Sequence, residues 1–535
     1  MDNVLSILTF TPALAGLILA IFLRGEDEMA QRNARWVALF ATALTFLMAL
    51  IVLVGFSTDT IGFQLVEERA WMFGLQYKIG IDGLSVMFVG LTAFMMPLVI
   101  IASWEVTHRV KEYMVSLLLL ETFVLGALMS LDLVLFFLFL EAAMVPVFLL
   151  IGIWGGPGRE TASFGALLAS AFGAIFLLSA MIVMFTEAGT TDISRLLDHQ
   201  FAKEDIRLLG LDVAGGIQTL LCLAVTLGLA VKLPIWPLHA WHPDAQLRAP
   251  LAAAIVLSAL LTLLAGYGLL RIALPIFPTG ALQLSPLIFA LASATALFAA
   301  VSALSQSDFR KMVAYISMTL IALAAMGLFS LNRQGFDGAI ILMLSQGLVA
   351  GGLLLSAGVL LDRQNSTRLD SFGGLSIKMP VFAGLMLFMI WTALGLPGSA
   401  GFVALVLTLS GLAAASPWVV IVAFVSLGLI AGALLSAFRK IMRGDLIKES
   451  LKSVEDLKPR ERLTLMSVAA VTLVLGLYPA FVTDRTGAAT QSLAELFEQE
   501  RQAGLETSKS FAGFTHPAQT ASLRPLRDID LQVSR

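Results

Sequence analysis

Apolar runs of about 20 residues recur along the whole chain and constrain its fold more than any other feature. A run of that length crosses the hydrocarbon core of a bilayer as a helix. Only 13% of the residues are charged, whereas soluble domains carry about 25%. The sequence therefore predicts an all-α polytopic membrane protein with about 14 transmembrane helices. Expected spans are 4–23, 35–56, 82–104, 112–130, 132–153, 163–186, 216–240, 250–272, 281–303, 309–330, 336–360, 378–410, 417–440 and 461–482.

Charge and cysteine content exclude several classes of protein. The formal net charge of −3 gives no basic surface for nucleic acid, and we expect none as a partner. The single cysteine, Cys222, lies inside an apolar run. It excludes an internal disulfide, a cysteine-ligated iron–sulfur cluster and a cysteine-rich zinc site. The first residues lack a basic start and a small-residue cleavage site, so we interpret them as the first span and not as a removed signal.

The distribution of lysine and arginine predicts which helix ends face the cytoplasm. Odd-numbered loops, counted with their flanks, hold 20 Lys and Arg, and even-numbered loops between spans hold 7. Because cytoplasmic loops carry the positive excess, the odd side is expected to be cytoplasmic. Loop 441–460 gives the strongest signal. Both termini then lie on the outer, periplasmic face.

Two of the expected spans are interrupted by proline and glycine residues. Pro234 and Pro237 interrupt the span at 216–240, and the segment "LPGSAG", with Pro397 and Gly398, interrupts the span at 378–410. The two breaks are five spans apart, which fits two inverted five-helix repeats with one broken helix each. Two unrelated proline kinks are the alternative, because membrane helices tolerate such kinks.

This repeat divides the chain into five expected parts. They are the first three spans (1–111), a first antiporter-like repeat (112–272), a second repeat (281–440), a cytoplasmic loop with the last helix (441–482) and a polar C-terminal tail (483–535). Residues 505–535 are expected to be mostly extended or disordered, since few of them are apolar.

Two glutamates are expected at matching depth in the membrane. A tight turn near Leu131–Asp132 joins two spans, and Glu121 and Glu141 each lie 10 residues from Leu131. At the helical rise per residue this is about 15 Å, near the middle of the membrane. Ionisable groups there mark an ion or proton path by default. The alternative for each is a protonated carboxyl that hydrogen-bonds to a helix backbone.

Lys232 is the third ionisable group inside a predicted span. Beside a carboxylate a buried lysine keeps its charge, and it releases a proton more readily when the carboxylate is neutralised. A pair of Glu141 and Lys232 is therefore a candidate proton relay. Pro234 removes a backbone hydrogen bond just after Lys232 and opens the helix there. The alternative is a structural ion pair that locks two helices.

Polar residues follow the break. His239 is a candidate proton shuttle, and a solvated helix end is the alternative reading. His239 and His242 are three residues apart, but Pro243 and Asp244 end any regular face. We therefore expect no metal site. No side chain has the setting of a catalytic nucleophile or base, so no catalytic residue is predicted.

Several motifs occur in the order known from one family. They are "GIDGLS" (Gly80 to Ser85), "FLEAAMVPVFLLIGIWGG" (Phe139 to Gly156), "AVKLPIWPLHAWHPDA" (Ala230 to Ala245), "AGYGLLR" (Ala265 to Arg271), "TALGLPGSAGF" (Thr392 to Phe402) and, near the end, "ESLKSVEDLKPRE" and "LGLYPAFVTD". Over roughly residues 1–485 the chain resembles the antiporter-like subunit M of respiratory complex I, the counterpart of mitochondrial NADH dehydrogenase subunit 4. The early and late motifs favour subunit M over subunits L and N and over Mrp-type antiporters.

The resemblance implies both a fold and a role. It implies fourteen helices, two inverted repeats and a polar axis at the membrane midplane, on which Glu141 and Lys232 match the family's pair and His239 matches its histidine. It also implies that the chain holds no redox cofactor. The expected partners are other membrane-arm subunits of complex I, with L and N neighbours, and lipid. The expected location is the bacterial inner (cytoplasmic) membrane.

The second half of that axis departs from the family pattern. Where the family usually has a lysine, two histidines and a glutamate, this chain has Leu263, Leu320, Gln346 and Leu405. Gln246 and Arg248 also replace a histidine and a glutamate. Leucine cannot exchange a proton, and an apolar lining tends to stay dry.

The sequence thus leaves three hypotheses for the function. In the first, the chain is a membrane-arm subunit of proton-pumping NADH:quinone oxidoreductase that still moves protons through Glu141 and Lys232. In the second, it belongs to the same complex as a non-pumping structural or coupling subunit. In the third, it is a subunit of a Mrp-type cation/proton antiporter.

Overall fold

The computed structural model describes residues 3–25, 27–58, 62–71, 75–208, 211–446 and 449–514. Within them, eleven helices are long and apolar enough to cross a membrane, or up to twelve if the bent pair Pro459–Leu477 and Ala480–Ala503 counts as one span. The eleven are α1 (Val4–Phe22), α2 (Glu28–Gly55), α3 (Gly83–Ala102), α4 (Val110–Met129), α5 with α6 (Leu133–Ala142 and Met144–Trp154), α7 (Arg159–Ala188), the segment α11 to α13 (Leu251–Ile276), α14 (Pro278–Ser305), α15 (Phe309–Phe329), α16 (Arg333–Gln364) and α19 (Pro417–Met442).

The remaining expected spans are helices with breaks or bends. The span at 216–240 is α9 (Gly216–Lys232), followed after the break by α10 (Trp241–Arg248). The span at 378–410 is α17 (Pro380–Ala393) and α18 (Ala400–Ala415), and the last span is α21 (Pro459–Leu477). Every one of the fourteen predicted segments therefore falls on helix, and the all-α polytopic fold is confirmed. The breaks lie five spans apart, where two five-helix repeats require them; the domain boundaries stay a prediction.

Backbone chemistry explains both breaks. Each proline lacks an N–H to donate and its ring crowds the preceding turn, and two of them, Pro234 and Pro237, follow directly on the end of α9 at Lys232. In the second break Gly395 and Gly398 have φ values of 64° and 85°. A side chain is strained in that left-handed region, so glycine suits both positions.

The span between residues 251 and 276 is buried along its whole most apolar stretch of 18 residues. It contains two π-helical turns, η2 (Leu257–Leu261) and η3 (Leu269–Ala273), between α11 (Leu251–Val256), α12 (Thr262–Gly268) and α13 (Leu274–Ile276). Such turns often occur at functional sites, because they leave backbone carbonyls without their usual partners. The apolar pattern of the sequence gave no sign of them.

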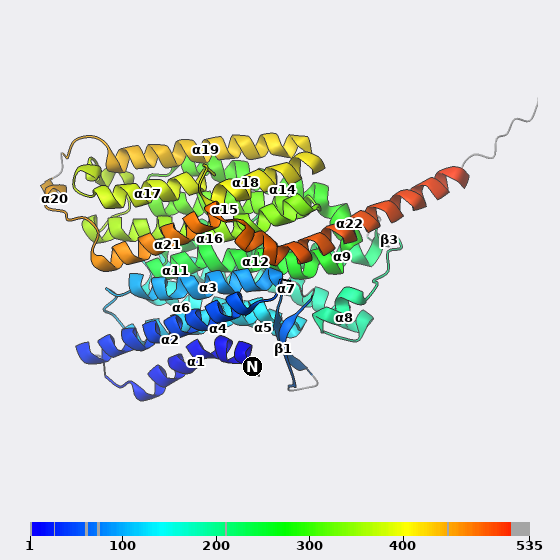
Figure 1. The fold of residues 1–535 in the computed structure, drawn as a ribbon, viewed down its shortest axis with the longest axis horizontal. Coiled ribbons are helices and arrows are strands. Elements are labelled where there is room, and N and C mark those ends of the chain that lie inside the picture. Colours follow the sequence, from blue (N-terminus) through cyan, green and yellow to red (C-terminus); the bar gives the residue numbers. More distant parts are fainter. Residues whose placement is uncertain are drawn as a thin grey trace, which may run out of the picture.

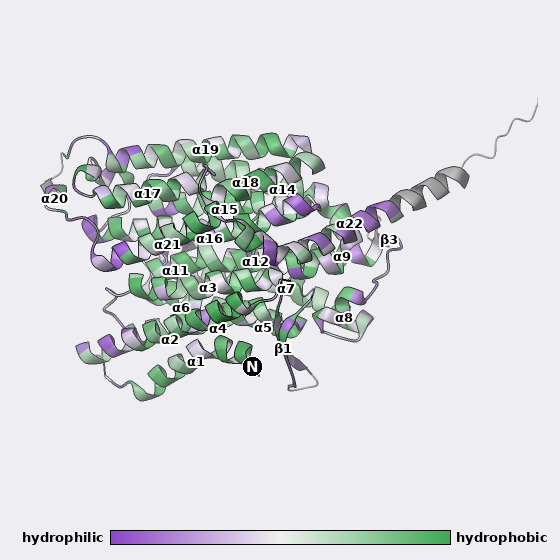
Figure 2. Cartoon of the chain, viewed as in Figure 1, coloured by the Kyte–Doolittle hydropathy of each residue, from purple (hydrophilic) through white to green (hydrophobic). Residues whose placement is uncertain are grey.

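The loops carry small elements at the two ends of the helices. One end has the antiparallel hairpins β1 (Gln64–Ala70) with β2 (Gln76–Ile81) and β3 (Ile206–Leu208) with β4 (Leu211–Val213), together with α8 (Ile193–Asp198). Figure 1 shows α20 (Glu449–Lys452) at the opposite end, and the short turns η4 (Leu369–Ser371) and η5 (Leu375–Ile377) follow α16. Hydrophobic residues dominate between the two ends in Figure 2, as expected of a membrane-spanning body.

The C-terminal region was predicted as a polar tail, and its described part is helical. Helix α22 (Ala480–Phe514) packs against α16, α3 and α14, so the expected extended or disordered start at residue 505 is wrong as far as 514. Its buried residues include Val482, Leu493 and Phe497, and the ring of Phe497 contacts that of Phe336. Spacings of 11 and four residues, close to whole numbers of helical turns, put these three residues on one face of the helix, but the polar residues between them hid the stripe. Residues 515–535 lie outside the described residues.

Candidate functional site

Glu141 and Lys232 form an ion pair inside the helical body. Glu141 lies in the last turn of α5, and Lys232 is the last residue of α9. The Lys232 Nζ is 3.1 Å from Glu141 Oε1 and 3.2 Å from Oε2. The lysine side chain is 4% exposed and the glutamate side chain 22%. The predicted ion pair therefore forms, and Glu141 is the more exposed of its two members.

Ser170 of α7 is the third member of this site, and the sequence prediction missed it. Its hydroxyl donates to Glu141 Oε2 at 2.9 Å and accepts a hydrogen bond from Lys232 Nζ. The residue is 2% exposed. Its hydroxyl therefore bridges the two charged groups, as a donor to the one and an acceptor from the other.

Two glycines bring α7 and α9 close enough for that bridge. A Cβ on Gly173 would lie 2.7 Å from the carbonyl oxygen of Gly228, and a Cβ on Gly228 would lie 2.9 Å from the carbonyl oxygen of Gly173. The contact is therefore reciprocal, and a side chain on either residue would force the helices apart. Gly173 is one turn from Ser170, and Gly228 one turn from Lys232. The small residues along α7 are the signal that could have pointed to this helix.

Two hydrogen bonds hold the non-helical segment after Lys232 in place. The indole Nε1 of Trp241 donates to the carbonyl oxygen of Val231 at 3.0 Å, and the backbone N–H of Trp236 donates to Thr295 Oγ1 at 2.8 Å. Lys232 is the last residue of α9, and the helix dipole favours a positive charge at a helix C-terminus. The broken-helix residues Pro234 and Pro237 place that terminus inside the molecule.

Glu121 and His239 are the two other predicted relay residues. In the part of the chain that the structure describes, neither makes a hydrogen bond or an ion pair with Glu141 or Lys232. Glu121 on α4 is 0% exposed, and neither carboxyl oxygen has a protein partner. His239 is 8% exposed, and its ring packs edge-on against Phe298 at 4.8 Å between centroids. Their place in the relay stays a prediction.

The residues that replace the family's charges all lie in the interior. Leu263, Leu320 and Leu405 are 0%, 2% and 5% exposed, and Gln346 is 1% exposed. They come from α12, α15, α18 and α16. Of these four, only Gln346 has a polar side chain, and its Nε2 donates to the carbonyl oxygen of Ser258 at 3.2 Å.

A second buried ion pair lies near the hairpin end of the helices. Arg271 in η3 pairs with Asp82, the residue before α3, and its Nε donates to the hydroxyl of Tyr267 at 3.0 Å. Asp82 also caps α3 by accepting hydrogen bonds from the backbone N–H groups of Leu84 and Ser85. The sequence places both charged residues in family motifs but gave no sign that they meet.

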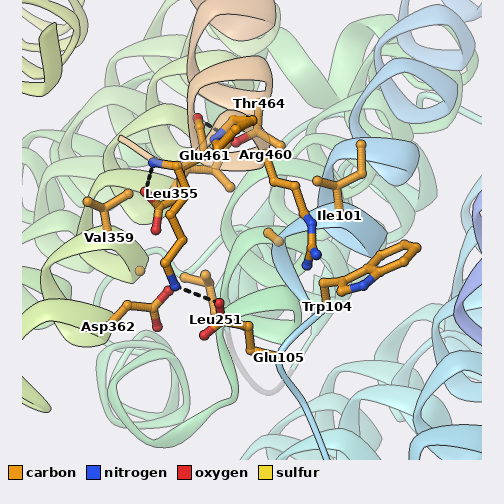
Figure 3. Close-up of a pocket in the computed structure, with 14 residues that line it drawn as sticks. Ile101, Trp104, Glu105, Leu251, Leu355, Val359, Asp362, Arg460, Glu461 and Thr464 are labelled. Atoms are coloured by element: carbon orange, nitrogen blue, oxygen red, sulfur yellow. Dashed lines mark hydrogen bonds and ion pairs between the residues drawn. The ribbon is translucent and has the colours of Figure 1, made fainter. Parts of the chain in front are cut away.

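A cavity of about 450 Å³ opens at the end of the helices predicted to be cytoplasmic. Figure 3 shows its charged lining, with Glu105, Asp362, Arg460 and Glu461 around an apolar floor. Lys458 reaches Glu105 at 2.8 Å, and this hydrogen bond is the main reason that the pKa of Lys458 lies above its ordinary value. The cavity contains none of the relay residues.

Comparison with known proteins agrees with this architecture. A family model described as the transmembrane NADH:quinone oxidoreductase/Mrp antiporter matches residues 130–431. NADH-quinone oxidoreductase subunit M of Rhodobacter capsulatus is 44% identical over 501 residues, 94% of this chain and 98% of that protein. NADH-ubiquinone oxidoreductase chain 4 of Chondrus crispus is 33% identical over 500 residues, 92% of this chain and 98% of that protein.

Solved structures share the fold. A chain of respiratory complex I from Thermus thermophilus superposes with a TM-score of 0.82 at 27% identity, over 92% of this chain and 99% of that one. A chain of the Mrp complex of a Dietzia species gives 0.78 at 21% identity, over 92% and 97%, which shows a common fold alone. The chain belongs to the NADH:quinone oxidoreductase/Mrp antiporter family of multi-pass membrane proteins, and within it to the antiporter-like M subunits of complex I.

Proposed function

We propose that this membrane-arm subunit of NADH:quinone oxidoreductase moves protons, and that the Glu141–Lys232 pair is the switch that couples their movement to electron transfer. The observation that carries the proposal is the buried lysine held by one carboxylate and one hydroxyl, with Nζ–Oε1 at 3.1 Å. Buried ionisable groups inside a membrane are costly and mark ion paths. The presence of this ion pair inside the helical body therefore argues for a function.

The chemistry of the pair supports a switch. While Glu141 is ionised it stabilises the charged ammonium group of Lys232, whose Nζ lies 3.1 Å from Oε1. When Glu141 is neutralised or drawn away, the buried ammonium loses that stabilisation and releases its proton. Ser170 can donate to the carboxylate and accept from the ammonium group, so it remains bonded to whichever partner stays in place. No electron transfer occurs at these groups.

The same proposal also covers the redox cofactors, the neighbouring subunits and the membrane. Redox cofactors belong to other subunits, and the neighbours in the membrane arm are the antiporter-like L and N subunits. Large apolar side chains stand exposed along α2, α7 and α19, such as Phe40 at 72%, Leu168 at 67% and Ile421 at 66%, which suits lipid or neighbouring helices. The membrane is the bacterial inner membrane with both termini outside, which the lysine and arginine distribution supports.

A second candidate function is a coupling spacer that no longer conducts protons. The leucines at 263, 320 and 405 favour it, because all three are buried where the family usually has charged or titratable groups. The Mrp-type alternative has less support, since the likeness to the Dietzia protein is at 21% identity and the identity with the Rhodobacter subunit is 44%.

The number of protons moved per NADH oxidised distinguishes a proton-moving subunit from a coupling spacer. Complex carrying Lys232→Ala or Glu141→Gln is reconstituted into vesicles, and protons moved per NADH oxidised are measured together with NADH:quinone reductase activity. We expect a lower proton yield in both variants and an unchanged yield in the control Lys458→Ala, whose side chain is 53% exposed. An unchanged yield in Lys232→Ala, with the complex assembled, would leave the spacer as the function.

A further inference from the structure

The cavity at the ends of α3, α16 and α21 is large enough for a ligand and has no part in the proposed relay. Its volume of about 450 Å³ lies within the range of about 300–1,000 Å³ that is typical of ligand sites. Its lining combines charged side chains with an apolar floor, so a ligand that fits it has both a charged and an apolar part.

Two of the charges that line the cavity lack a partner. Glu105 is paired with Lys458 at 2.8 Å, and Glu461 with an arginine of α16 at 2.7 Å. In the part of the chain that the structure describes, the side chains of Asp362 and Arg460 make neither an ion pair nor a hydrogen bond. Figure 3 shows these two side chains on opposite sides of the cavity. The cavity therefore presents one negative and one positive group to a ligand.

Aromatic and apolar side chains indicate that the cavity lies at the membrane surface. Trp104 in the lining packs edge-on against Trp36 of α2, with 5.3 Å between the ring centroids, and Trp36 is 56% exposed. Tryptophan is enriched at the level of the lipid headgroups. Leu355 and Val359 in the lining are 4% and 3% exposed and offer apolar contact alone. A soluble zwitterion would leave these two side chains uncovered, whereas a phospholipid would cover them with the first part of an acyl chain.

Arg460 distinguishes between two zwitterionic headgroups. Its guanidinium carbon lies 5.0 Å from the centre of the Trp104 ring, so the aromatic face that would attract a quaternary ammonium group is already covered. A primary ammonium group instead donates charge-assisted hydrogen bonds to a carboxylate, and Asp362 offers one. The N–H groups of the guanidinium match the oxygens of a phosphate.

We propose that this cavity binds a zwitterionic phospholipid with a primary amine, of the phosphatidylethanolamine class. Asp362 accepts hydrogen bonds from the ammonium group, Arg460 donates to the phosphate, and Leu355 and Val359 contact the first part of an acyl chain. An anionic lipid without an amine would leave the carboxylate of Asp362 without a partner. The site does not depend on the proposed movement of protons, because its residues belong to the ends of the helices and not to the relay.

The first test uses the unmodified complex. It is reconstituted in nanodiscs with a phosphatidylethanolamine that carries a photoreactive acyl chain, and the labelled peptides are identified after illumination. We expect label on α3, α16 and α21 around the cavity, and its loss when excess phosphatidylethanolamine competes. Phosphatidylcholine and phosphatidylglycerol should compete about tenfold less well, since neither brings a primary ammonium group to Asp362. No label at the cavity, or equal competition by either of these lipids, overturns the proposal.

The headgroup without its acyl chains separates a lipid from a soluble zwitterion. Water-soluble glycerophosphoethanolamine carries the same ammonium and phosphate groups, but it cannot cover the apolar floor of the cavity. We expect it to compete far less well than the lipid. Equal competition would assign the cavity to a soluble zwitterion and overturn the lipid as its ligand.

Two variants test the named groups. Asp362→Asn and Arg460→Gln each remove one charge, and we expect about a tenfold loss of label in each. Asp370→Asn and Arg368→Gln are the controls, because they lie close after α16 in the sequence, outside the cavity lining, with side chains that are 65% and 62% exposed. NADH:quinone reductase activity shows that each variant complex is assembled. Undiminished label in an assembled Asp362→Asn or Arg460→Gln complex, or the same loss in the controls, would refute the site.

Discussion

Ser170 gives the most direct test of how the ion pair is held. Ser170→Ala removes a donor to Glu141 and an acceptor from Lys232, and a lost hydrogen bond to charged groups costs roughly 1–3 kcal/mol. We expect a lower proton yield and a shifted pH profile of proton movement, with NADH oxidation retained. Ser170→Thr keeps the hydroxyl and should restore both. A yield and profile in Ser170→Ala equal to those of the unmodified complex would show that the bridge has no role in coupling.

Two ion pairs of different burial should contribute very differently to stability. The side chains of Asp82 and Arg271 are 10% and 6% exposed, and Arg271→Met leaves an uncompensated buried carboxylate, at a cost of about 3–5 kcal/mol. The matched variant Lys458→Met breaks an exposed pair, worth about 0–1 kcal/mol. Thermal unfolding of the purified complex should show a large shift for the first variant and almost none for the second. Equal shifts would contradict the difference in burial.

The pH dependence of the Asp82–Arg271 pair follows from its surroundings. Burial by itself raises the pKa of Asp82, but Arg271 and the N–H group of Ser85 outweigh this effect, and the pKa lies below its ordinary value of 3.8. A lowered carboxyl pKa stabilises the fold above the unfolded value, and this contribution is lost as the pH falls below it. We expect that Arg271→Met no longer shows this loss of thermal stability as the pH falls. An unchanged slope of stability against pH below about 4 would contradict it.

Sequence reasoning found charged residues more readily than their partners. Glu141 and Lys232 stood out because a charge inside an apolar run is conspicuous, and the proline break supported the second of them. Ser170 did not stand out, because a serine among small and apolar residues is common in membrane helices. Its role depends on the rotation and closeness of α7 and α9, which no pattern along one helix contains.

At the scale of helices, the crossing of α7 and α9 holds the site. Gly173→Ala adds a methyl group 2.7 Å from a carbonyl oxygen, and such overpacking typically costs about 1–3 kcal/mol. We expect a lower melting temperature and a reduced proton yield, because the separation weakens the bond between Ser170 and Lys232. Gly165→Ala is the control on the same helix, since its added methyl would meet nothing within 4 Å. Similar losses in both variants would refute the role of the close crossing.

The elements that the sequence predicted best are those with long apolar runs. All fourteen segments are helical, since a backbone in lipid must satisfy its hydrogen bonds internally. Helix α22 was missed because its buried stripe of Val482, Leu493 and Phe497 is thin and its other residues are polar. The turns η2 and η3 were missed because a π-helical turn changes the hydrogen bonding of a helix without changing its hydropathy.

Over the whole molecule, the two ends of the helical body differ in charge and in structure. The end with the hairpins and α8 carries few lysines and arginines, and the opposite end carries loop 441–460, which holds eight of them when its flanks are counted. The Glu141–Lys232 pair lies between them at the end of α9, and the cavity near Glu105 and Asp362 opens at the end with loop 441–460. Such a difference in lysine and arginine content is the signal that predicts which end faces the cytoplasm.

The orientation of the molecule can be tested directly with single cysteines. The native Cys222 is buried, so Cys222→Ala gives a background without reactive thiols, in which Ser453→Cys and Arg207→Cys place one thiol at each end. Positive loops face the cytoplasm, so an impermeant maleimide should label Ser453→Cys in inside-out vesicles and Arg207→Cys in right-side-out vesicles. Arg207 is 76% exposed, so poor access would not explain a missing label. The reverse pattern would invert the orientation, and the cavity near Glu105 would then face the outside instead of the cytoplasm.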